Sequence, residues 1–435
     1  MAAADDFLEA SPSAQRLYWK EFANYIGTVM LMGLFAVPAA LAQSGAGPTP
    51  GTMMDASEAV IVGAPLHVVQ MASELTGNEH KASEGEAPLD PGPMATNLSP
   101  ALKPTAIQAA MRKVADWQSA RVADTPSQDW TYATLYAGLL SASETLEEPR
   151  YRDLVLHVAE HYQWTLGPRK THADDQAIGQ SYLWLYRQSS SPERIQPLKA
   201  QFDAIMQLPD DPAKPVWWWC DALFMAPPVW SGLASVTHDA KYLNYMDHEW
   251  KITSSLLWDP HERLFFRDSG YFDKREKNGR KVFWSRGNGW VRGGLVRVLE
   301  NLPTNDPARK FYLDKFQQMA DSVAKIQSAD GLWRAGLLDA ADYPHPEVSG
   351  SAFFVYAIAW GINHHVLDRK RFGPVVKNGW AGLVHHIYAD GRLGSIQPVG
   401  EAPSAYTDSS NYVFGVGAFL LAGSEVNQLS QKSGG

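Results

Sequence analysis

Cysteine is almost absent from this chain, because Cys220 is the single cysteine among 435 residues. An intrachain disulfide is therefore impossible, and a cysteine-rich metal site is excluded. Positive charge is not in excess either, since the formal net charge is −9. An acidic balance argues against nucleic acid or an anionic membrane as a general partner. The 45% share of hydrophobic residues is typical of a globular protein.

Long apolar runs are missing except near the amino terminus. There, Arg16 and Lys20 precede an uncharged stretch, 25–42, that ends in an A-x-A cleavage pattern. We therefore expect residues 1–42 to be a signal peptide, with an uncleaved amino-terminal anchor as the alternative. An exported chain without disulfides suggests a bacterial periplasm or outer face. We expect a periplasmic or extracellular location and no stable membrane partner.

Sequence motifs of several enzyme classes are also missing. The chain has no phosphate-binding G-x-x-x-x-G-K-[ST] or G-x-G-x-x-G pattern, no H-E-x-x-H zinc motif and no G-x-S-x-G nucleophile elbow. The pairs His364-His365 and His385-His386 are adjacent, so neither pair can converge on one helical face. We therefore expect neither a metal nor another cofactor. Cys220 is expected to be a buried, unreactive thiol.

The composition changes along the chain. Residues 43–103 are rich in Gly, Pro, Ser and Ala, which predicts a linker or a loosely packed, partly disordered lead-in. The folded domain is expected over residues 104–430.

Aromatic residues are abundant, with 16 Trp, 17 Tyr and 16 Phe. Many occur with small residues at helical spacing in six segments that begin with polar residues, at positions 129, 174, 221, 286, 349 and 411. More charged amphipathic stretches alternate with them, over 106–120, 148–166, 192–207, 240–257, 308–327 and 371–387. The alternation predicts an all-α fold with six buried inner helices and six outer helices in a ring. Polar residues at the inner helix starts would then gather at one end.

Strand-like patterns are few. Two short apolar runs, 262–268 and 281–284, flank a polar turn that contains Asn278-Gly279. This arrangement predicts a small β-hairpin inserted between the third and fourth inner helices.

Three acidic residues are candidates for catalysis. Asp221 follows three tryptophans and Cys220, and such an apolar wall should raise its pKa, which suits a general acid. A helix-capping Asp is the alternative. Asp174 and Asp175 are adjacent, so they point about 100° apart on a helix and at most one should face the site. His172 lies just upstream, and an isolated His is more often structural than catalytic.

A second group of candidates could bind an acidic sugar. In the segment 283–290, Arg286 offers a fork for a carboxylate, and Trp284 and Trp290 offer stacking faces. Arg267, beside Asp268 on the predicted hairpin, could form another anion contact, with an ordinary surface ion pair as the alternative. The combination suits a sugar that carries a carboxylate.

Five segments in order resemble glycoside hydrolase family 105, the unsaturated rhamnogalacturonyl hydrolases, which are related to the unsaturated glucuronyl hydrolases of family 88. The resemblance extends from about residue 105 to 425, and its segments are Ala173–Gln180, Trp219–Pro227, Leu264–Asp268, Phe283–Trp290 and Gly350–Asn363. It implies an (α/α)6 barrel that acts on an oligosaccharide ending in a 4,5-unsaturated uronate, the product of a polysaccharide lyase. The implied reaction hydrates the C4=C5 double bond, and the hemiketal that forms then releases the next sugar.

The resemblance also implies roles for individual residues. Asp221 would be the acid and base, and one of Asp174 and Asp175, with a slight preference for Asp174, would hold the sugar hydroxyls and the water. Trp219, Trp284 and Trp290 would line the sugar site, with Arg286 close to the substrate or to Asp221, and Tyr132 would be a further contact. Some family members carry a His in the hairpin region, whereas this chain has Arg267 there, which leaves the group that binds the carboxylate open.

The sequence leaves two alternative functions open. One is another (α/α)6-barrel glycosidase or a lyase acting on saturated acidic polysaccharide. The other is a glycan-binding protein without catalysis. The parent polysaccharide stays open between rhamnogalacturonan, arabinogalactan, ulvan and related glycans, and so does the oligomeric state.

Overall fold

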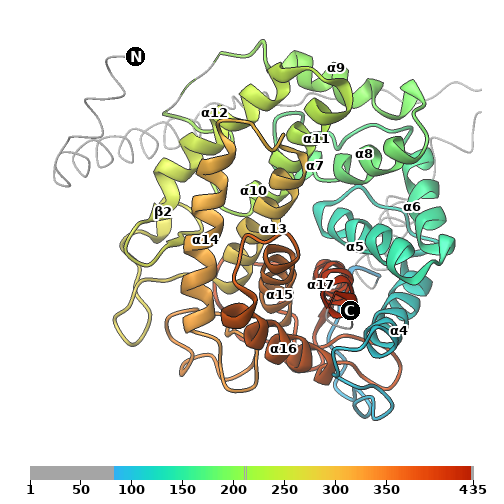
Figure 1. The fold of residues 1–435 in the computed structure, drawn as a ribbon, viewed down its shortest axis with the longest axis vertical. Helices are drawn as coiled ribbons and strands as arrows, with labels where there is room; N and C mark the ends of the chain where they lie inside the picture. The colour runs from blue at the N-terminus through green and yellow to red at the C-terminus, as the bar shows by residue number, and fades with distance from the viewer. Residues whose placement is uncertain (1–82, 210, 212, 433–435) are drawn as a thin grey trace, which may run out of the picture. The chain divides into compact units, whose positions relative to one another are not determined.

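A computed structural model describes residues 83–209, 211 and 213–432, all within one unit of the chain, Gln70–Gly435. The expected signal peptide, 1–42, and the first part of the expected lead-in lie outside the described residues. Within them, helices are arranged in two concentric layers (Figure 1).

The inner layer consists of the helices in which most residues are buried. They are α5 (Trp130–Leu146), α8 (Gly179–Gln188), α11 (Pro227–Thr237), α13 (Ser285–Asn301), α15 (Val348–Asn363) and α17 (Val413–Gln431). Each contacts the next, and α17 contacts α5, so the ring is closed. In α15 every residue is buried, which is the property that an all-round apolar helix requires.

The outer layer consists of amphipathic helices that bury one face only. They are α4 (Pro104–Val122), α6 (Pro149–His161), α9 (Gln196–Ile205), α12 (Ala240–Leu257), α14 (Arg309–Lys325) and α16 (Arg369–His385). A short 3-10 helix, η1 (Pro192–Arg194), precedes α9. Inner and outer helices alternate along the chain, as the sequence predicts, and the (α/α)6 barrel is confirmed.

Glycines let the inner helices approach one another closely. A Cβ on Gly417 of α17 would lie 2.2 Å from the Thr134 carbonyl oxygen of α5. A Cβ on Gly138 of α5 would lie 2.5 Å from the Gly417 carbonyl oxygen. Any side chain at either position would push the two helices apart, so the small residues in these segments are needed for ring closure.

The second and third inner helices begin with a separate short helix. The helix α7 (Ala173–Gln176) precedes α8, and α10 (Ala222–Met225) precedes α11. At the second break Pro227 and Pro228 start α11, where prolines fit because the first helical N–H groups have no partner within the helix. Asp174 lies in the first of these short helices, and Asp221 directly precedes the second.

Two small antiparallel strand pairs complete the described fold. One hairpin pairs β2 (Trp258–Asp259) with β3 (Leu264–Phe265). A small hairpin is therefore inserted between the third and fourth inner helices, but the predicted pairing is wrong: the run 262–268 supplies β3, which pairs with the preceding β2 and not with 281–284. The segment 281–284 instead forms isolated bridges from Lys281 to Arg275 and from Trp284 to Gly336. A second 3-10 helix, η2 (Ser269–Tyr271), follows the hairpin.

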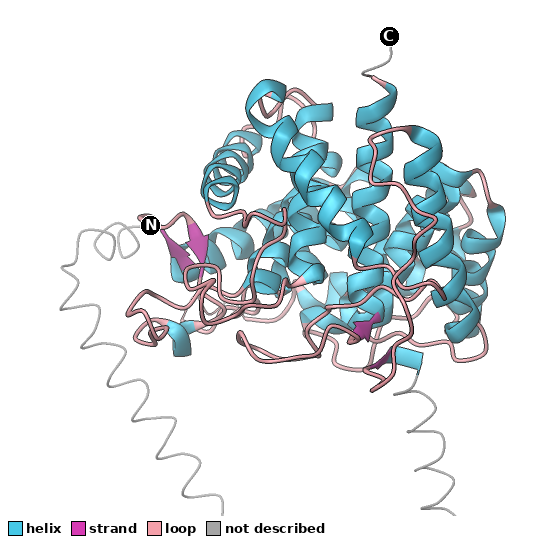
Figure 2. Ribbon diagram, turned by 90° about the horizontal axis from the view of Figure 1, so that it is seen from below, coloured by secondary structure: helices cyan, strands magenta, loops and turns pink. Residues whose placement is uncertain are grey.

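The end of the expected lead-in belongs to the folded body. The strand β1 (Gly85–Glu86) pairs with β4 (Asn411–Tyr412), which directly precedes α17. Met94 bridges to Tyr388, and the Ala95 N–H donates to the Ile387 carbonyl. The composition of the segment predicted loose packing, but backbone pairing with residues more than 290 positions later in the sequence orders it. In Figure 2 one strand pair lies at the left of the view and the other at its lower right, and many long loops run along the lower side.

Two kinds of feature are absent from the residues that the structure describes. No helix among them has the length and apolar character needed to cross a membrane. They also contain no cluster of three or more His, Cys, Asp or Glu side chains able to hold a metal ion.

Candidate active site

The starts of two neighbouring inner segments bring Asp174 and Asp221 together. Asp174 lies in α7, Asp221 directly precedes α10, and these two short helices are in contact. The charge of Asp221 contributes to the raised pKa of Asp174, so the carboxyl groups are electrostatically coupled. The structure therefore joins two of the predicted acidic residues at the end of the ring where inner helices begin.

Asp221 is a buried residue with 9% of its surface exposed. The Cys220 thiol donates to its Oδ2 at 3.4 Å, and the Arg267 Nε lies 3.9 Å from the same oxygen. Burial raises the pKa of Asp221, and the charges of Arg267 and Arg286 oppose that rise. The side chain forms no capping hydrogen bond with α10, so helix capping does not account for it. A buried carboxyl that retains its proton can act as a general acid.

Asp174 has a pKa close to neutrality. Burial, together with the charge of Asp221, raises its pKa to about 7. His172 precedes it as the cap of α7, and the His172 Nδ1 accepts a hydrogen bond from the Asp174 N–H at 3.4 Å. The same nitrogen lies 3.6 Å from the Asp174 Oδ2. Burial lowers the pKa of His172, which favours the neutral imidazole.

Asp175 points to a different partner. Its carboxylate accepts hydrogen bonds from the Arg169 backbone N–H at 2.6 Å, the Arg169 Nε at 3.0 Å and the Arg169 Nη2 at 2.5 Å. The Asp175 carbonyl also accepts from the Gly167 N–H. Asp175 therefore fixes the turn before α7, and of the adjacent pair the structure brings Asp174 to Asp221.

Arg267 stands beside Asp221 at the end of the hairpin. Its Nη1 donates to the Asp268 Oδ2 at 2.6 Å and lies 3.6 Å from the Glu401 Oε2. Burial alone would lower the pKa of Arg267, but the carboxylates of Asp221 and Asp268 raise it. Its buried Nε has no hydrogen-bond partner among the described residues. A cation that is fixed beside Asp221 is suited to attracting an anionic group.

Arg286 is fully buried and is held by a loop. Its Nη1 donates to the Gln397 carbonyl at 2.5 Å and its Nη2 to the Pro398 carbonyl at 2.7 Å. Its guanidinium also covers the ring of Trp284 at 4.4 Å. Burial lowers the pKa of Arg286, whereas the charges of Glu347 and Asp221 support its protonated form. Arg286 thus contributes charge near Asp221 while its donors bind the protein.

The predicted aromatic residues are less open than expected. Trp290 is fully buried against Phe224 and Phe353, with ring centroids 5.0 and 4.6 Å away. Trp284 is 2% exposed, because Arg286 covers it. Its Nε1 donates to the Gln397 Oε1 at 2.9 Å. A face covered by protein cannot stack on a sugar, so neither Trp284 nor Trp290 offers an open stacking surface.

Tyr132 and Trp219 are also largely buried. The Tyr132 hydroxyl is 2.6 Å from the Ser83 Oγ, which ties the first inner helix to the segment before β1. The Trp219 ring lies 4.8 Å from the His172 ring. Trp219 is thus next to the Asp174 side of the site.

Gln397 was not predicted from the sequence and connects several site residues. Its Oε1 accepts from Trp284, and its Nε2 donates to the Ala402 carbonyl at 2.7 Å and the Ser404 Oγ at 2.8 Å. Its N–H donates to the Glu347 Oε1 at 3.2 Å. It lies in a loop without a catalytic motif, so no local pattern could have indicated it.

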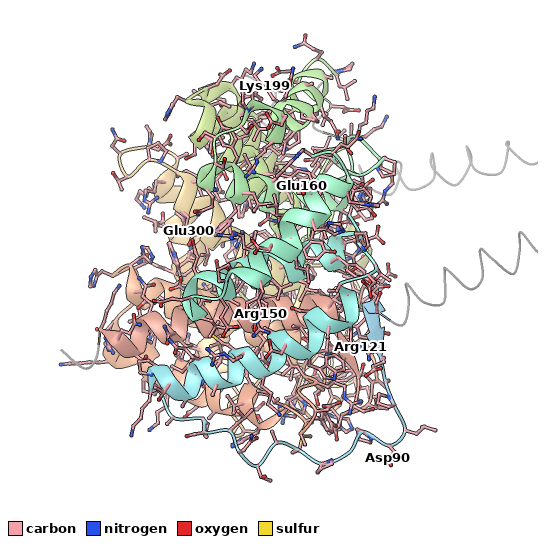
Figure 3. All side chains as sticks on the ribbon, turned by 90° about the vertical axis from the view of Figure 1, so that its right-hand side faces the viewer. Asp90, Arg121, Arg150, Glu160, Lys199 and Glu300 are labelled. Atoms are coloured by element: carbon pink, nitrogen blue, oxygen red, sulfur yellow. The ribbon has the colours of Figure 1, made fainter. Side chains whose placement is uncertain are left out.

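Another charged region lies at the opposite end of the ring. A cavity of about 230 Å³ there is lined by residues of all six inner helices, including Glu144, Arg187, Arg297, Glu300 and Glu425. In Figure 3 Glu300 lies toward one end of the ring and Arg121, in the last turn of α4, toward the other. None of the candidate residues lines this cavity.

Residues 105–430 match the sequence model of Glycosyl Hydrolase Family 88. The chain belongs to glycosyl hydrolase family 88. It is therefore a hydrolase, and the resemblance to this pair of related families is confirmed.

Relatives of this family 88 chain include two curated proteins named unsaturated 3S-rhamnoglycuronyl hydrolase. The protein from Formosa agariphila is 39% identical over 344 residues, which cover 75% of this chain and 91% of the relative. The protein from Alteromonas sp. is 35% identical over 330 residues, which cover 71% of this chain and 80% of the relative. A solved structure of a family 88 glycosyl hydrolase from Bacteroides vulgatus is 29% identical, with a TM-score of 0.72, and the alignment covers 75% of this chain and 99% of that one.

Proposed function

We propose that this protein removes the terminal 4,5-unsaturated uronate from oligosaccharides that a polysaccharide lyase has produced. The observation that supports it most is the coupled pair of carboxyls, half-buried Asp174 and buried Asp221, beside the cation Arg267. The names of the two curated relatives support a substrate in which the unsaturated uronyl unit is attached to rhamnose.

In the proposed reaction Asp221 acts as the acid and then as the base. Its carboxyl proton is transferred to C4 of the uronate, and a water molecule adds at C5. The resulting Asp221 carboxylate takes one proton from that water, which restores the carboxyl group. The product is a hemiketal, whose opening breaks the bond to the next sugar. A raised pKa suits this cycle because the acid must be protonated before each turnover.

The other residues would bind and orient the substrate. Asp174 holds the water and a sugar hydroxyl, because a carboxyl with a pKa of about 7 can both donate and accept hydrogen bonds near neutral pH. Arg267 binds the uronate carboxylate through the charge of its guanidinium, which lies beside Asp221. Asp175 holds the α7 turn through Arg169 and takes no part in the chemistry.

A direct test follows the double bond. The purified protein is mixed with unsaturated oligosaccharides made by lyases from several acidic polysaccharides, and the ultraviolet absorbance of the conjugated uronate is recorded. We expect the absorbance to fall with the wild-type protein and to persist with Asp221→Asn. Sugar release from saturated polymer, without loss of absorbance on any unsaturated substrate, would instead favour hydrolysis at the anomeric carbon.

We also propose that the chain is exported to a bacterial periplasm or beyond, on the pattern of residues 1–42. Cell fractionation, with mass determination of the mature amino terminus, tests this. A protein recovered from the cytoplasm with its first residues intact would contradict it.

A further inference from the structure

One tryptophan near the candidate site is exposed although its neighbours are buried. Trp218 is 48% exposed, whereas Trp217 is 1% and Trp219 is 4% exposed. Leaving a large aromatic ring in water sacrifices the stabilisation that its burial would provide. The run of three tryptophans directly precedes Cys220 and Asp221, so the exposed ring belongs to the segment that carries the proposed acid.

Trp218 is held in place from two directions. Its ring centroid lies 4.8 Å from that of Trp219, with the planes inclined by 51°. The guanidinium carbon of Arg267 lies 5.5 Å from the same ring. Because the Arg267 Nε is also 3.9 Å from the Asp221 Oδ2, the exposed ring and the proposed acid are close to the same arginine.

A loop brings a carboxylate to the same cation. The Glu401 Oε2 lies 3.6 Å from the Arg267 Nη1, and the Glu401 side chain is 67% exposed. Gln397 holds this loop through the Ala402 carbonyl and the Ser404 hydroxyl. Trp218 and Glu401 therefore approach Arg267 together, one with an apolar face and the other with hydrogen-bond acceptors.

We propose that Trp218 and Glu401 form a subsite for the leaving sugar, the unit that the reaction releases from the unsaturated uronate. The inference rests on the proposed function. The flat Trp218 ring stacks on the C–H face of that sugar, and the Glu401 carboxylate accepts hydrogen bonds from its hydroxyl groups. An apolar face beside a charged acceptor matches a pyranose, which has C–H groups on its faces and hydroxyls at its edge.

The kinetic test compares two substrates that differ only on the leaving side. One is an unsaturated disaccharide with an intact leaving sugar, and the other is the unsaturated uronate with a methyl group in its place. We expect Trp218→Ala to raise KM for the disaccharide about five- to tenfold and to leave KM for the methyl glycoside unchanged. Trp218→Phe should restore most of the difference, because it keeps an aromatic face. Glu401→Gln should raise KM for the disaccharide alone. Equal effects of Trp218→Ala on both substrates would overturn the subsite.

A binding measurement separates this inference from the proposed reaction. The disaccharide is titrated into Asp221→Asn protein and into the Asp221→Asn, Trp218→Ala double variant by calorimetry. We expect affinity to fall about five- to tenfold in the double variant. That loss would support the subsite even if the wild-type protein left the double bond intact, which would refute only the reaction. Equal affinities would refute the subsite whatever the activity.

Discussion

Replacing Asp174 with asparagine should stabilise the folded protein at alkaline pH. The folded pKa of Asp174 is about 7, because of burial and the charge of Asp221. An aspartate in the unfolded chain titrates near 3.9. Between these pH values the unfolded chain releases the proton while the folded protein keeps it. The free energy of unfolding therefore decreases as pH rises through this range.

The size of the effect follows from the two pKa values. The interval between about 3.9 and about 7 corresponds to about 4 kcal/mol of lost stability once both states are ionised. Asparagine removes the charge but still buries polar atoms, so we expect Asp174→Asn to gain about 1–3 kcal/mol at pH 8. That gain corresponds to a rise in Tm of about 1–4 °C in a domain of this size. At pH 4, where Asp174 is protonated in the folded protein, the gain should nearly vanish.

The assay is thermal unfolding of wild-type and variant protein from pH 4 to pH 8. Asp175→Asn is the matched control, since the neighbouring carboxylate accepts three hydrogen bonds from Arg169. Asp175→Asn should lower Tm at pH 6 to 8, whereas Asp174→Asn should raise it. A Tm difference for Asp174→Asn that is the same at pH 4 and pH 8 would refute the argument, because no proton would then be linked to folding at this position.

Three further variants test other parts of the structure. Cys220→Ala removes the thiol that donates to Asp221, so the pKa of Asp221 should rise. The alkaline limb of the profile of kcat against pH should then move to higher pH. An unchanged pH profile would argue against Asp221 as the acid. Gln397→Ala removes three side-chain hydrogen bonds, to Trp284, Ala402 and Ser404, and should lower kcat/KM about tenfold or more while Tm changes little. Unchanged kinetics would show that these hydrogen bonds are not needed to position the site. Gly294→Ala places a Cβ 2.1 Å from the Leu223 carbonyl oxygen, so it should lower Tm or prevent folding, and a fully stable variant would contradict the close packing of α13 on α10.

The helical framework could be predicted because its signal is periodic. The helix α12, Ala240–Leu257, was expected over those residues, since apolar positions recur along one face of a helix. The strand pairs were predicted less well. Two-residue strands carry too few positions for an alternating pattern, and β1 depends on a partner, β4, from the other end of the domain.

The sequence by itself determined the alternation of buried and amphipathic helices and the family, and it predicted Asp221 as the acid. Each of these follows from patterns within a short segment or from the order of such segments. Only the tertiary structure decided which of Asp174 and Asp175 meets Asp221, because adjacent helical positions look equivalent until their partners are placed.

Tertiary packing also decided which tryptophans have a free face. Trp290 is enclosed by aromatic rings from other helices, and Trp284 is covered by Arg286, whereas Trp218 remains exposed. In the sequence these residues look alike, because burial depends on segments far away along the chain. The composition therefore gives the number of aromatic residues, but which aromatic rings are exposed is decided by the folded structure alone.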